Sequence, residues 1–146
     1  DRLQNAVERR LRAPAPLAVL LVDLERVDDS GGAAGDAVLR AVARRLQGCV
    51  RTEDTVARLG EAVFGVLVDD VGDGPVAVLA ERIRAAVGVP VEVGRSASVR
   101  LDAGVAVVVS DGGHDADALL AEAEQRIGDI RSSGRGGVEL VVVPFG

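Results

Sequence analysis

The chain has 146 residues, which suits one domain with a core of its own and leaves little room for a second. Hydrophobic residues make up 48% and charged residues 27%, a globular balance, and no apolar run approaches the roughly 18–20 residues that span a bilayer. The net charge of −6 argues against a nucleic acid partner, because binding a phosphate backbone needs a basic excess.

These limits lead to expectations about the whole protein. Cys49 is the only cysteine, so no intrachain disulfide can form, which suits a reducing compartment. We therefore expect a cytoplasmic protein without membrane contact. Because the chain begins with Asp1 and contains no methionine, we expect residues 1–146 to be a single domain taken from a longer multidomain protein.

The first half of the chain alternates between helical and strand-like patterns. Residues 2–12 carry apolar side chains on one face of a helix, and the continuous apolar run Leu17–Val22 is typical of a strand buried on both faces. Polar residues and glycines at 28–32 predict a loop. Helical spacing of apolar residues predicts a long helix over 37–50, with Cys49 as a small apolar filler near its end.

The second half predicts a hairpin, two more helices and further strands. Runs 55–59 and 63–68 are short and β-prone and meet at Gly60-Glu61, which indicates a hairpin. The other elements expected are a helix over 74–87, strands over 89–93 and 99–109, a helix over 115–131 preceded by the loop residue His114, and a strand over 138–143. This order predicts an α+β sandwich in which helices flank one mixed sheet.

Four short motifs carry a family resemblance when they are taken together and in order. The segments are Gly35–Leu39 (a GD-x-x-L helix start), Thr55–Gly60 with Phe64 (the signature hairpin), Ala80–Arg84 (the following helix) and Ser133-Gly134-Arg135 (a closing S-G-R). Over nearly its whole length the chain therefore resembles the GGDEF domain of diguanylate cyclases. The resemblance implies bacterial signal transduction and a nucleotidyl-cyclase-like fold with a ferredoxin-like palm core and a mixed, mostly antiparallel sheet.

The carboxylates that the family's chemistry needs are only partly present. Joining two GTP molecules uses divalent metal ions, which prefer oxygen ligands. In the family one carboxylate is the first Asp after strand one, matched here by Asp23, and another is the third hairpin residue, matched by Ala62. Glu61 is one position away, and alternation along a strand predicts that its side chain points to the opposite face. We therefore expect neither a bound metal ion nor another cofactor.

The rest of the signature, which reads Gly60-Glu61-Ala62-Val63-Phe64, departs from the family pattern as well. Glu61 replaces a glycine that lets the backbone approach the substrate phosphates, and Val63 replaces a glutamate. The segment after the first strand is shorter than in the family and lacks the asparagine that contacts guanine. These positions are interpreted as vestigial, and the sequence predicts that the chain is not an enzyme.

Three charged residues match other positions of the family's nucleotide site. Asp36 matches a guanine contact, but without its companion we expect it to act as a helix cap. Arg131 and Arg135 match basic positions that hold triphosphate in the family. The alternative for both arginines is a favourable interaction with the dipole at a helix C-terminus.

An R-x-x-D sequence precedes the hairpin and resembles the product site of the family. Arg51-Thr52-Glu53-Asp54 stands at the matching distance from Gly60, and Arg82 matches a further arginine on the next helix. Arginine forks bind phosphate oxygens in pairs and stack on purine faces. We expect Arg51, Asp54 and Arg82 to bind cyclic di-GMP; the alternative is that Arg51 and Asp54 form a solvated ion pair at a helix end.

Three functions remain open from the sequence. The first is a catalytically inactive receptor of cyclic di-GMP, for which the resemblance implies a ligand-linked homodimer and partners among the other domains of the parent protein. The second is a ligand-free module for dimerisation or protein interaction. The third is a weak enzyme acting on GTP or another nucleotide.

Overall fold

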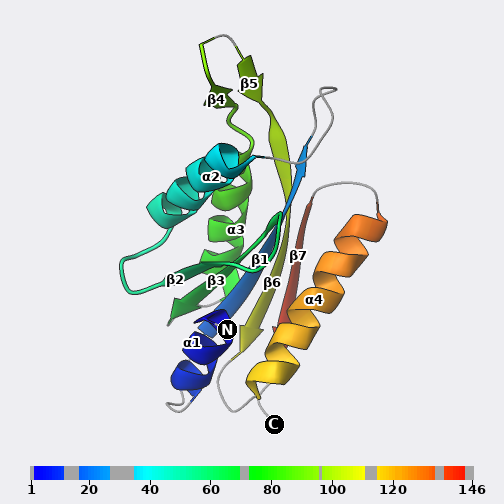
Figure 1. Cartoon of the computed structure of the whole chain (residues 1–146). Helices are drawn as coiled ribbons and strands as arrows, with labels where there is room; N and C mark the ends of the chain where they lie inside the picture. Colours follow the sequence, from blue (N-terminus) through cyan, green and yellow to red (C-terminus); the bar gives the residue numbers. More distant parts are fainter. Residues whose placement is uncertain are drawn as a thin grey trace.

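The computed structural model of this chain describes residues 2–11, 17–26, 35–69, 73–95, 97–110, 115–133 and 137–143. The elements, shown in Figure 1, are α1 (Arg2–Leu11), β1 (Leu17–Arg26), α2 (Asp36–Cys49), β2 (Thr55–Arg58), β3 (Val63–Asp69), α3 (Asp73–Val87), β4 (Val91–Val93), β5 (Ala97–Val99), β6 (Leu101–Ser110), α4 (Ala116–Ser132) and β7 (Gly137–Val143). The helix boundaries fall within one residue of the predicted ones. None of the described helices is long and apolar enough to cross a membrane.

The main sheet has five strands in the order β2-β3-β1-β6-β7. β1 pairs antiparallel with β3 on one side and with β6 on the other, and β2 extends the sheet antiparallel to β3. β7 lies at the other edge and runs parallel to β6. The predicted α+β sandwich with a mixed, mostly antiparallel sheet is confirmed, and the predicted hairpin is the β2–β3 pair.

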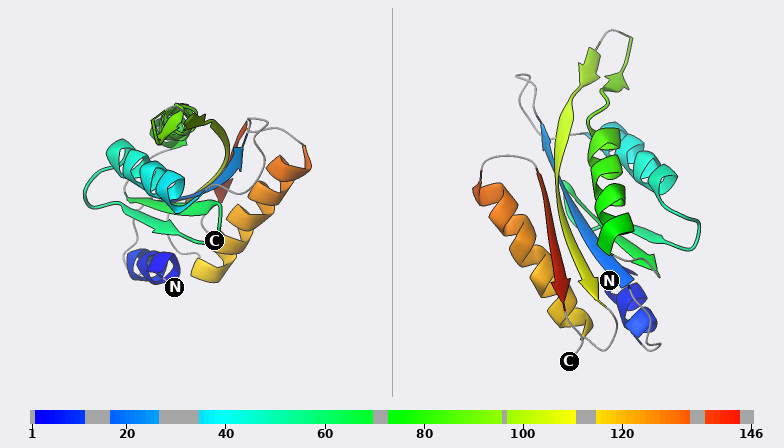
Figure 2. Two further views of the ribbon diagram at one scale, coloured as in Figure 1. Left: turned by 45° about the horizontal axis from the view of Figure 1, so that its top comes forward. Right: turned by 180° about the vertical axis from the view of Figure 1, so that it is seen from behind.

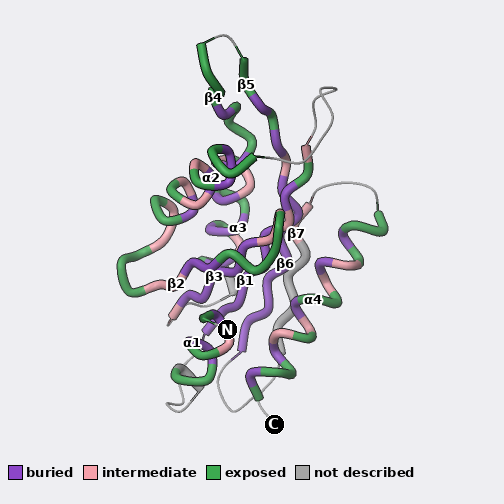
Figure 3. The backbone as a smooth tube through the Cα atoms, viewed as in Figure 1, coloured by how far each residue is buried: buried purple, intermediate pink, exposed green. Residues whose placement is uncertain are grey.

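Alternation of side chains along β1 gives the sheet two buried faces. Leu20 and Val22 belong to a hydrophobic cluster on the face covered by α2 and α3. Val19 and Leu21 belong to a second cluster on the face covered by α1 and α4. Figure 2 shows these two helix pairs on opposite sides of the sheet, and Figure 3 shows the buried residues along its central strands. The prediction that β1 is buried on both faces is confirmed.

β1 is longer than predicted, and Asp23 lies inside the strand rather than after it. Asp23 pairs with Val63 of β3 and with Gly104 of β6, and the ladder to β6 continues as far as Arg26 opposite Leu101. A polar side chain does not end a strand when the backbone groups on both sides are paired. The sheet therefore fixes the backbone position of Asp23.

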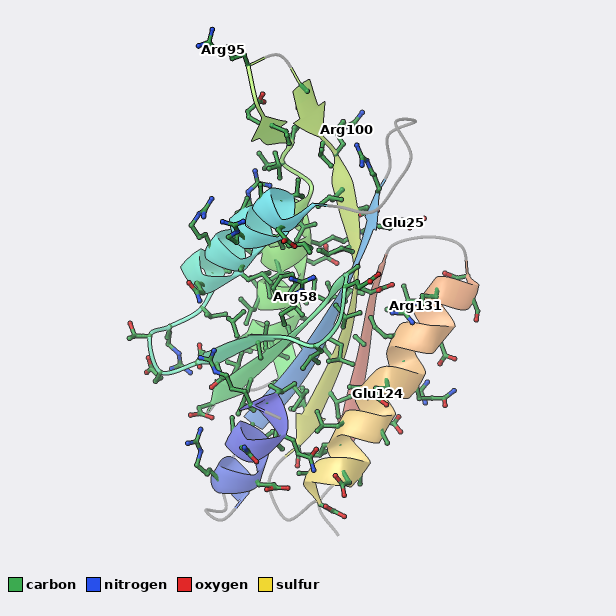
Figure 4. The ribbon with its side chains drawn as sticks, viewed as in Figure 1. Glu25, Arg58, Arg95, Arg100, Glu124 and Arg131 are labelled. Atoms are coloured by element: carbon green, nitrogen blue, oxygen red, sulfur yellow. The ribbon has the colours of Figure 1, made fainter. Side chains whose placement is uncertain are left out.

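β4 and β5 form a separate two-stranded ribbon, so the prediction of a single sheet with one strand over 99–109 is wrong. Val91 pairs with Val99, and the chain is interrupted at Arg100 before β6 enters the main sheet. Gly94 in the connection has a φ of 68°, a left-handed conformation that favours glycine. The ribbon projects beyond the helices, with Arg95 at its end (Figure 4).

Cys49 at the end of α2 has the structural role that the sequence predicts. It is half-buried against the cluster between the sheet and α2 and α3. Burial raises the pKa of its thiol, although the charge of Arg82 opposes the shift. The predicted loop at 28–32 and His114 lie outside the described residues.

Two strand glycines allow α1 and α4 to pack directly on the sheet. A Cβ atom on Gly65 of β3 would lie 2.5 Å from Cδ2 of Leu3 and 3.0 Å from Cδ1 of Leu59. A Cβ atom on Gly104 of β6 would lie 2.7 Å from Cγ2 of Ile130. Because protein interiors are close-packed, a larger side chain at either position would push the facing helix outward.

Arg45 joins α2 to the end of α3 and to the segment that follows it. Its guanidinium donates hydrogen bonds to the backbone oxygens of Ala86, at 3.1 Å, Pro90, at 3.0 Å, and Val89. Carbonyl groups at a helix C-terminus lack partners within the helix, so these bonds satisfy acceptors that would otherwise need water.

Replacement of Gly65 by valine tests the close packing of α1 on β3. We expect Gly65→Val to lower the free energy of unfolding by about 1–3 kcal/mol, because Leu3 must leave its position against the strand. Chemical denaturation measures the change. Gly137→Val is the matched control, since no atom of the described residues, apart from its chain neighbours, lies within 4 Å of a Cβ added to this strand glycine. Equal destabilisation by both substitutions would contradict the close-packing argument.

The ion pair between Arg84 of α3 and Asp102 of β6 predicts a pH-dependent contribution to stability. Two hydrogen bonds of 3.2 Å join the side chains. Burial raises the pKa of Asp102, but hydrogen bonds from Arg84 and from the Ala103 N–H, together with the Arg84 charge, outweigh it and lower the pKa overall. The pair therefore stabilises the fold above the unfolded pKa of about 3.9, and this stabilisation is lost as pH falls through the lower folded pKa.

We expect Asp102→Asn to lower the free energy of unfolding at pH 7 by less than about 1 kcal/mol, because both side chains are about a third exposed. The difference in the free energy of unfolding between the variant and the wild type should shrink as pH falls toward 2, because protonation removes the charge of Asp102 in the wild type. Urea denaturation at the two pH values measures it. Glu92→Gln, at an exposed position of β4, is the control. A difference that stays constant with pH would contradict the prediction.

Candidate functional site

Asp23 lies in β1 beside the start of β3, next to the hairpin residues Gly60–Phe64. Its cross-strand partner in β3 is Val63. The next hydrogen bond of the ladder runs from the Leu24 N–H to the carbonyl oxygen of Ala62, at 2.8 Å. Leu24 and Ala62 both pack against the cluster under α2 and α3, so the Ala62 side chain lies on the face opposite Asp23. The hairpin residue in register with Asp23 is therefore Val63.

This register changes the argument about Glu61. The sequence argument counted from Ala62 and assigned Glu61 to the face away from Asp23. Ala62 itself lies on that other face, and Glu61 precedes it outside β3, so strand alternation assigns no face to Glu61. Glu61 is exposed in the bend before β3. Alternation consequently does not exclude Glu61 from this corner of the molecule.

Arg131, near the C-terminal end of α4, is bound to Asp23. Its Nε donates to Oδ2 at 2.9 Å and its Nη2 to Oδ1 at 2.8 Å. The hydrogen bonds to Asp23 raise the pKa of Arg131 above its ordinary value, against the opposing effect of burial. Figure 4 shows Arg131 reaching from α4 toward the strands. Neither the triphosphate role nor the helix-dipole role that the sequence suggested for Arg131 includes this ion pair.

As they are placed, the side chains around Asp23 do not fit a divalent cation. Both Asp23 oxygens accept hydrogen bonds from Arg131, and Val63 opposite has no donor atom for a metal. Within the described ranges, no three or more His, Cys, Asp or Glu side chains are grouped so that they could hold a metal ion. Magnesium needs several oxygen ligands in octahedral geometry. In this arrangement, in which Arg131 occupies both oxygens of Asp23, we therefore assign no metal ion to this carboxylate.

A cavity of about 440 Å³ lies between α2 and β2, and Asp36 and Phe64 are among the residues that line it. The expectation that Asp36 caps the helix is wrong. The N-cap residue is Gly35, no side chain makes a capping hydrogen bond there, and Asp36 is the first helical residue. Its carboxylate still interacts favourably with the positive end of the helix dipole. Asp36 is exposed and, like Phe64, is a position of the family pattern that borders the cavity.

Arg51 and Asp54 form a compact turn between α2 and β2, which we call the R-x-x-D turn. The Asp54 carboxylate accepts from the backbone N–H of Arg51, at 2.9 Å, and from the N–H of Asp69, at 3.4 Å. The Nε of Arg51 lies 3.6 Å from Asp54 Oδ2, and its Nη2 donates to the carbonyl oxygen of Asp69. The Asp54 side chain is 2% exposed and the Arg51 side chain 52%, so the pair is not fully solvated.

Arg82 of α3 lies beside this turn. Its Nη2 donates to the backbone oxygen of Cys49 at 3.3 Å, and Cys49 is two residues before Arg51. The structure therefore brings together the three residues that the sequence selected for the R-x-x-D site. Arg135, which the sequence assigned to the triphosphate site, lies outside the described residues.

The sequence reasoning did not single out Arg2, Arg40 and Arg58, which also line the cavity between α2 and β2. These arginines come from α1, α2 and β2. No spacing in the sequence links them, because the three elements meet only in the folded chain. Of the three, only Arg40 had a signal in the sequence, as a basic residue on the polar face of the helix predicted over 37–50.

Comparison with known proteins gives consistent results. The family model described as "Diguanylate cyclase, GGDEF domain" matches residues 1–137. The bifunctional diguanylate cyclase/cyclic di-GMP phosphodiesterase MucR of Pseudomonas aeruginosa is 32% identical over 142 residues, covering 94% of this chain and 21% of MucR. Diguanylate cyclase TpbB of Pseudomonas aeruginosa strain UCBPP-PA14 is 34% identical over 146 residues, covering 95% of this chain and 33% of TpbB. The chain thus spans a third or less of these relatives.

A solved structure supports the same relationship. The GGDEF domain of TpbB from Pseudomonas aeruginosa PAO1 superimposes with a TM-score of 0.84 at 30% sequence identity, and the match covers 95% of this chain and 87% of that domain. The strand order and helix arrangement described above are thus those of a known domain type.

These relatives overturn the expectation that the chain is not an enzyme. MucR and TpbB match nearly all of the chain and are named diguanylate cyclases, which points to a cyclase. The expectation rested on a few hairpin and loop positions and on an alternation argument about Glu61. The register of β1 and β3 does not support that argument, so the loss of a carboxylate at Ala62 does not by itself decide activity.

Proposed function

The chain belongs to the GGDEF family, and from this premise we propose that it acts in cyclic di-GMP signalling by binding the dinucleotide at the R-x-x-D turn. Arg51 and Arg82 contact the ligand, and Asp54 holds Arg51 in place. Cyclic di-GMP carries two phosphate groups and two guanine rings, for which arginine forks are suitable partners.

The observation that carries this proposal is the preorganisation of Arg51. The buried Asp54 carboxylate fixes the turn through two backbone N–H groups, while about half of the Arg51 side chain remains exposed. An arginine that is held before the ligand arrives loses less rotamer freedom on binding. Its charge-assisted hydrogen bonds to phosphate are also stronger than neutral ones.

Arg82 extends the same surface from a second element. It is exposed on α3, and its hydrogen bond to the Cys49 carbonyl keeps it next to the R-x-x-D turn. Two guanidinium groups from different elements can bind two phosphates, or one phosphate and one purine face. This division of contacts suits a dinucleotide better than a mononucleotide.

Titration calorimetry with cyclic di-GMP tests the proposal. We expect Arg51→Ala and Arg82→Ala each to weaken binding by roughly tenfold to a hundredfold, the effect of losing a charge-assisted hydrogen bond. Arg44→Ala, at an exposed position on α2 outside the turn, is the matched control and should bind like the wild type. Asp54→Asn should also weaken binding, because its single amide oxygen can accept only one of the two backbone hydrogen bonds and its amide nitrogen would face the other N–H group.

Two results would contradict the proposal. Wild-type binding that survives both arginine substitutions would place the dinucleotide elsewhere. A flat titration for the wild type would favour the alternative of a ligand-free module for dimerisation or protein interaction.

Synthesis of cyclic di-GMP from GTP is a second candidate function, favoured by the names of the relatives. On this candidate, the chain incubated with GTP and Mg²⁺ produces cyclic di-GMP, which chromatography detects. Asp23→Asn removes the charge of the one family carboxylate that is retained and should reduce the rate by roughly a hundredfold or more. Arg44→Ala is again the control. No product from the wild-type chain would reject this candidate and leave the binding proposal untouched.

A further inference from the structure

The β4–β5 ribbon has an apolar face that continues from the core to the outside of the molecule. Val91 pairs with Val99 across the ribbon. Val93 and Ala97 form the outer pair on the same face, because side chains alternate along a strand. The inner pair is buried in the cluster under α2 and α3, whereas Val93 is 37% exposed and Ala97 is exposed as well. The outer half of this apolar face is therefore open to solvent.

Arg95 adds a positive charge to the tip of the ribbon. It forms no hydrogen bond or ion pair with any residue that the structure describes. Figure 4 shows its side chain directed away from the rest of the molecule. An isolated two-stranded ribbon is at best marginally stable in water, so a surface that covers its outer half would stabilise it.

A groove lies between α1 and α4, on the opposite face of the sheet from α2 and α3. It encloses a cavity of about 230 Å³, which Leu3 and Leu21 line as buried side chains and Leu59 as one that is 39% exposed. Figure 2 shows α1 and α4 next to each other on this side of the sheet. Sites for small molecules typically have volumes of roughly 300–1,000 Å³, so this α1–α4 groove suits protein side chains better than a nucleotide.

The rim of the α1–α4 groove is negatively charged. Among the described residues that line it, the charged ones are Asp117 and Glu124. Gln4 donates to Oδ1 of Asp117 at 2.8 Å, and this neutral partner leaves the charge of the carboxylate in place. Glu124 has no hydrogen bond or ion pair within the described ranges. Complementary charge at a rim guides association, so the groove favours an apolar segment with a basic residue beside it.

We propose that the α1–α4 groove binds the tip of the β4–β5 ribbon of a second copy of this chain, with Val93 against Leu59 and Arg95 beside Glu124. The ribbon lies at the end of the molecule away from α1, so it does not reach the groove of its own chain (Figure 1). No residue of the R-x-x-D turn takes part, so the association needs no cyclic di-GMP. The contact is small, and we expect a dissociation constant on the order of 0.1–1 mM.

Sedimentation equilibrium of the whole chain, without any nucleotide, tests the proposal. We expect the average mass of the wild type to rise with concentration. Arg95→Glu and Glu124→Arg should each weaken self-association about tenfold or more, because each brings like charges together. The variant with both substitutions restores opposite charges and should associate again. Arg44→Glu and Glu81→Arg, at exposed positions of α2 and α3 outside both surfaces, are the controls with the same changes of charge.

A mixing experiment separates the ribbon from the groove. Val93→Asp disrupts the ribbon and keeps the groove, whereas Glu124→Arg disrupts the groove and keeps the ribbon. Each variant alone should be monomeric, and the mixture should form pairs of one chain of each kind. The proposal is overturned if the wild type stays monomeric at about 1 mM, if the mixture does not associate, or if the controls weaken association as much as Arg95→Glu.

Discussion

The close approach of α4 to β6 at Gly104 determines the surroundings of Asp23. Gly104 is the cross-strand partner of Asp23, and its missing side chain leaves room for Ile130. The next residue, Arg131, then reaches the Asp23 carboxylate with two hydrogen bonds. The absence of a side chain at Gly104 thus brings the positive charge of Arg131 next to the Asp23 carboxylate. Whatever displaces α4 would change that charge as well as the packing.

The β2–β3 hairpin links the other features. β2 begins directly after the R-x-x-D turn, and its last residue, Arg58, borders the cavity. β3 packs against α1 at Gly65, where Leu3 contacts the strand. The R-x-x-D turn, the cavity between α2 and β2 and the N-terminal helix therefore contact the same pair of strands. Events at two places become energetically coupled only if each favours one arrangement of a shared element, and the R-x-x-D turn and the cavity share this hairpin.

The sequence predicted the features that depend on local periodicity and missed those that depend on pairing between distant segments. The apolar run of β1 and the helical spacing in α2 were sufficient for the fold, because each pattern matches only one regular structure. The register that places Val63, and not Ala62, opposite Asp23 depends on how two strands meet. The same holds for the Asp23–Arg131 pair, whose members are 108 residues apart. Motif spacing contains no information about either contact.

The Asp23–Arg131 ion pair does not prevent a nucleotide from binding at this position. The Arg131 side chain is 54% exposed and Asp23 is 17% exposed, and ion pairs open to solvent typically contribute no more than about 1 kcal/mol. A phosphate group offers Arg131 the same paired acceptors as the carboxylate, so exchange between the two has a low energetic cost. Once Arg131 turns to a phosphate, Asp23 regains both oxygens. The pairing in the unliganded chain is thus compatible with the cyclase names of its relatives.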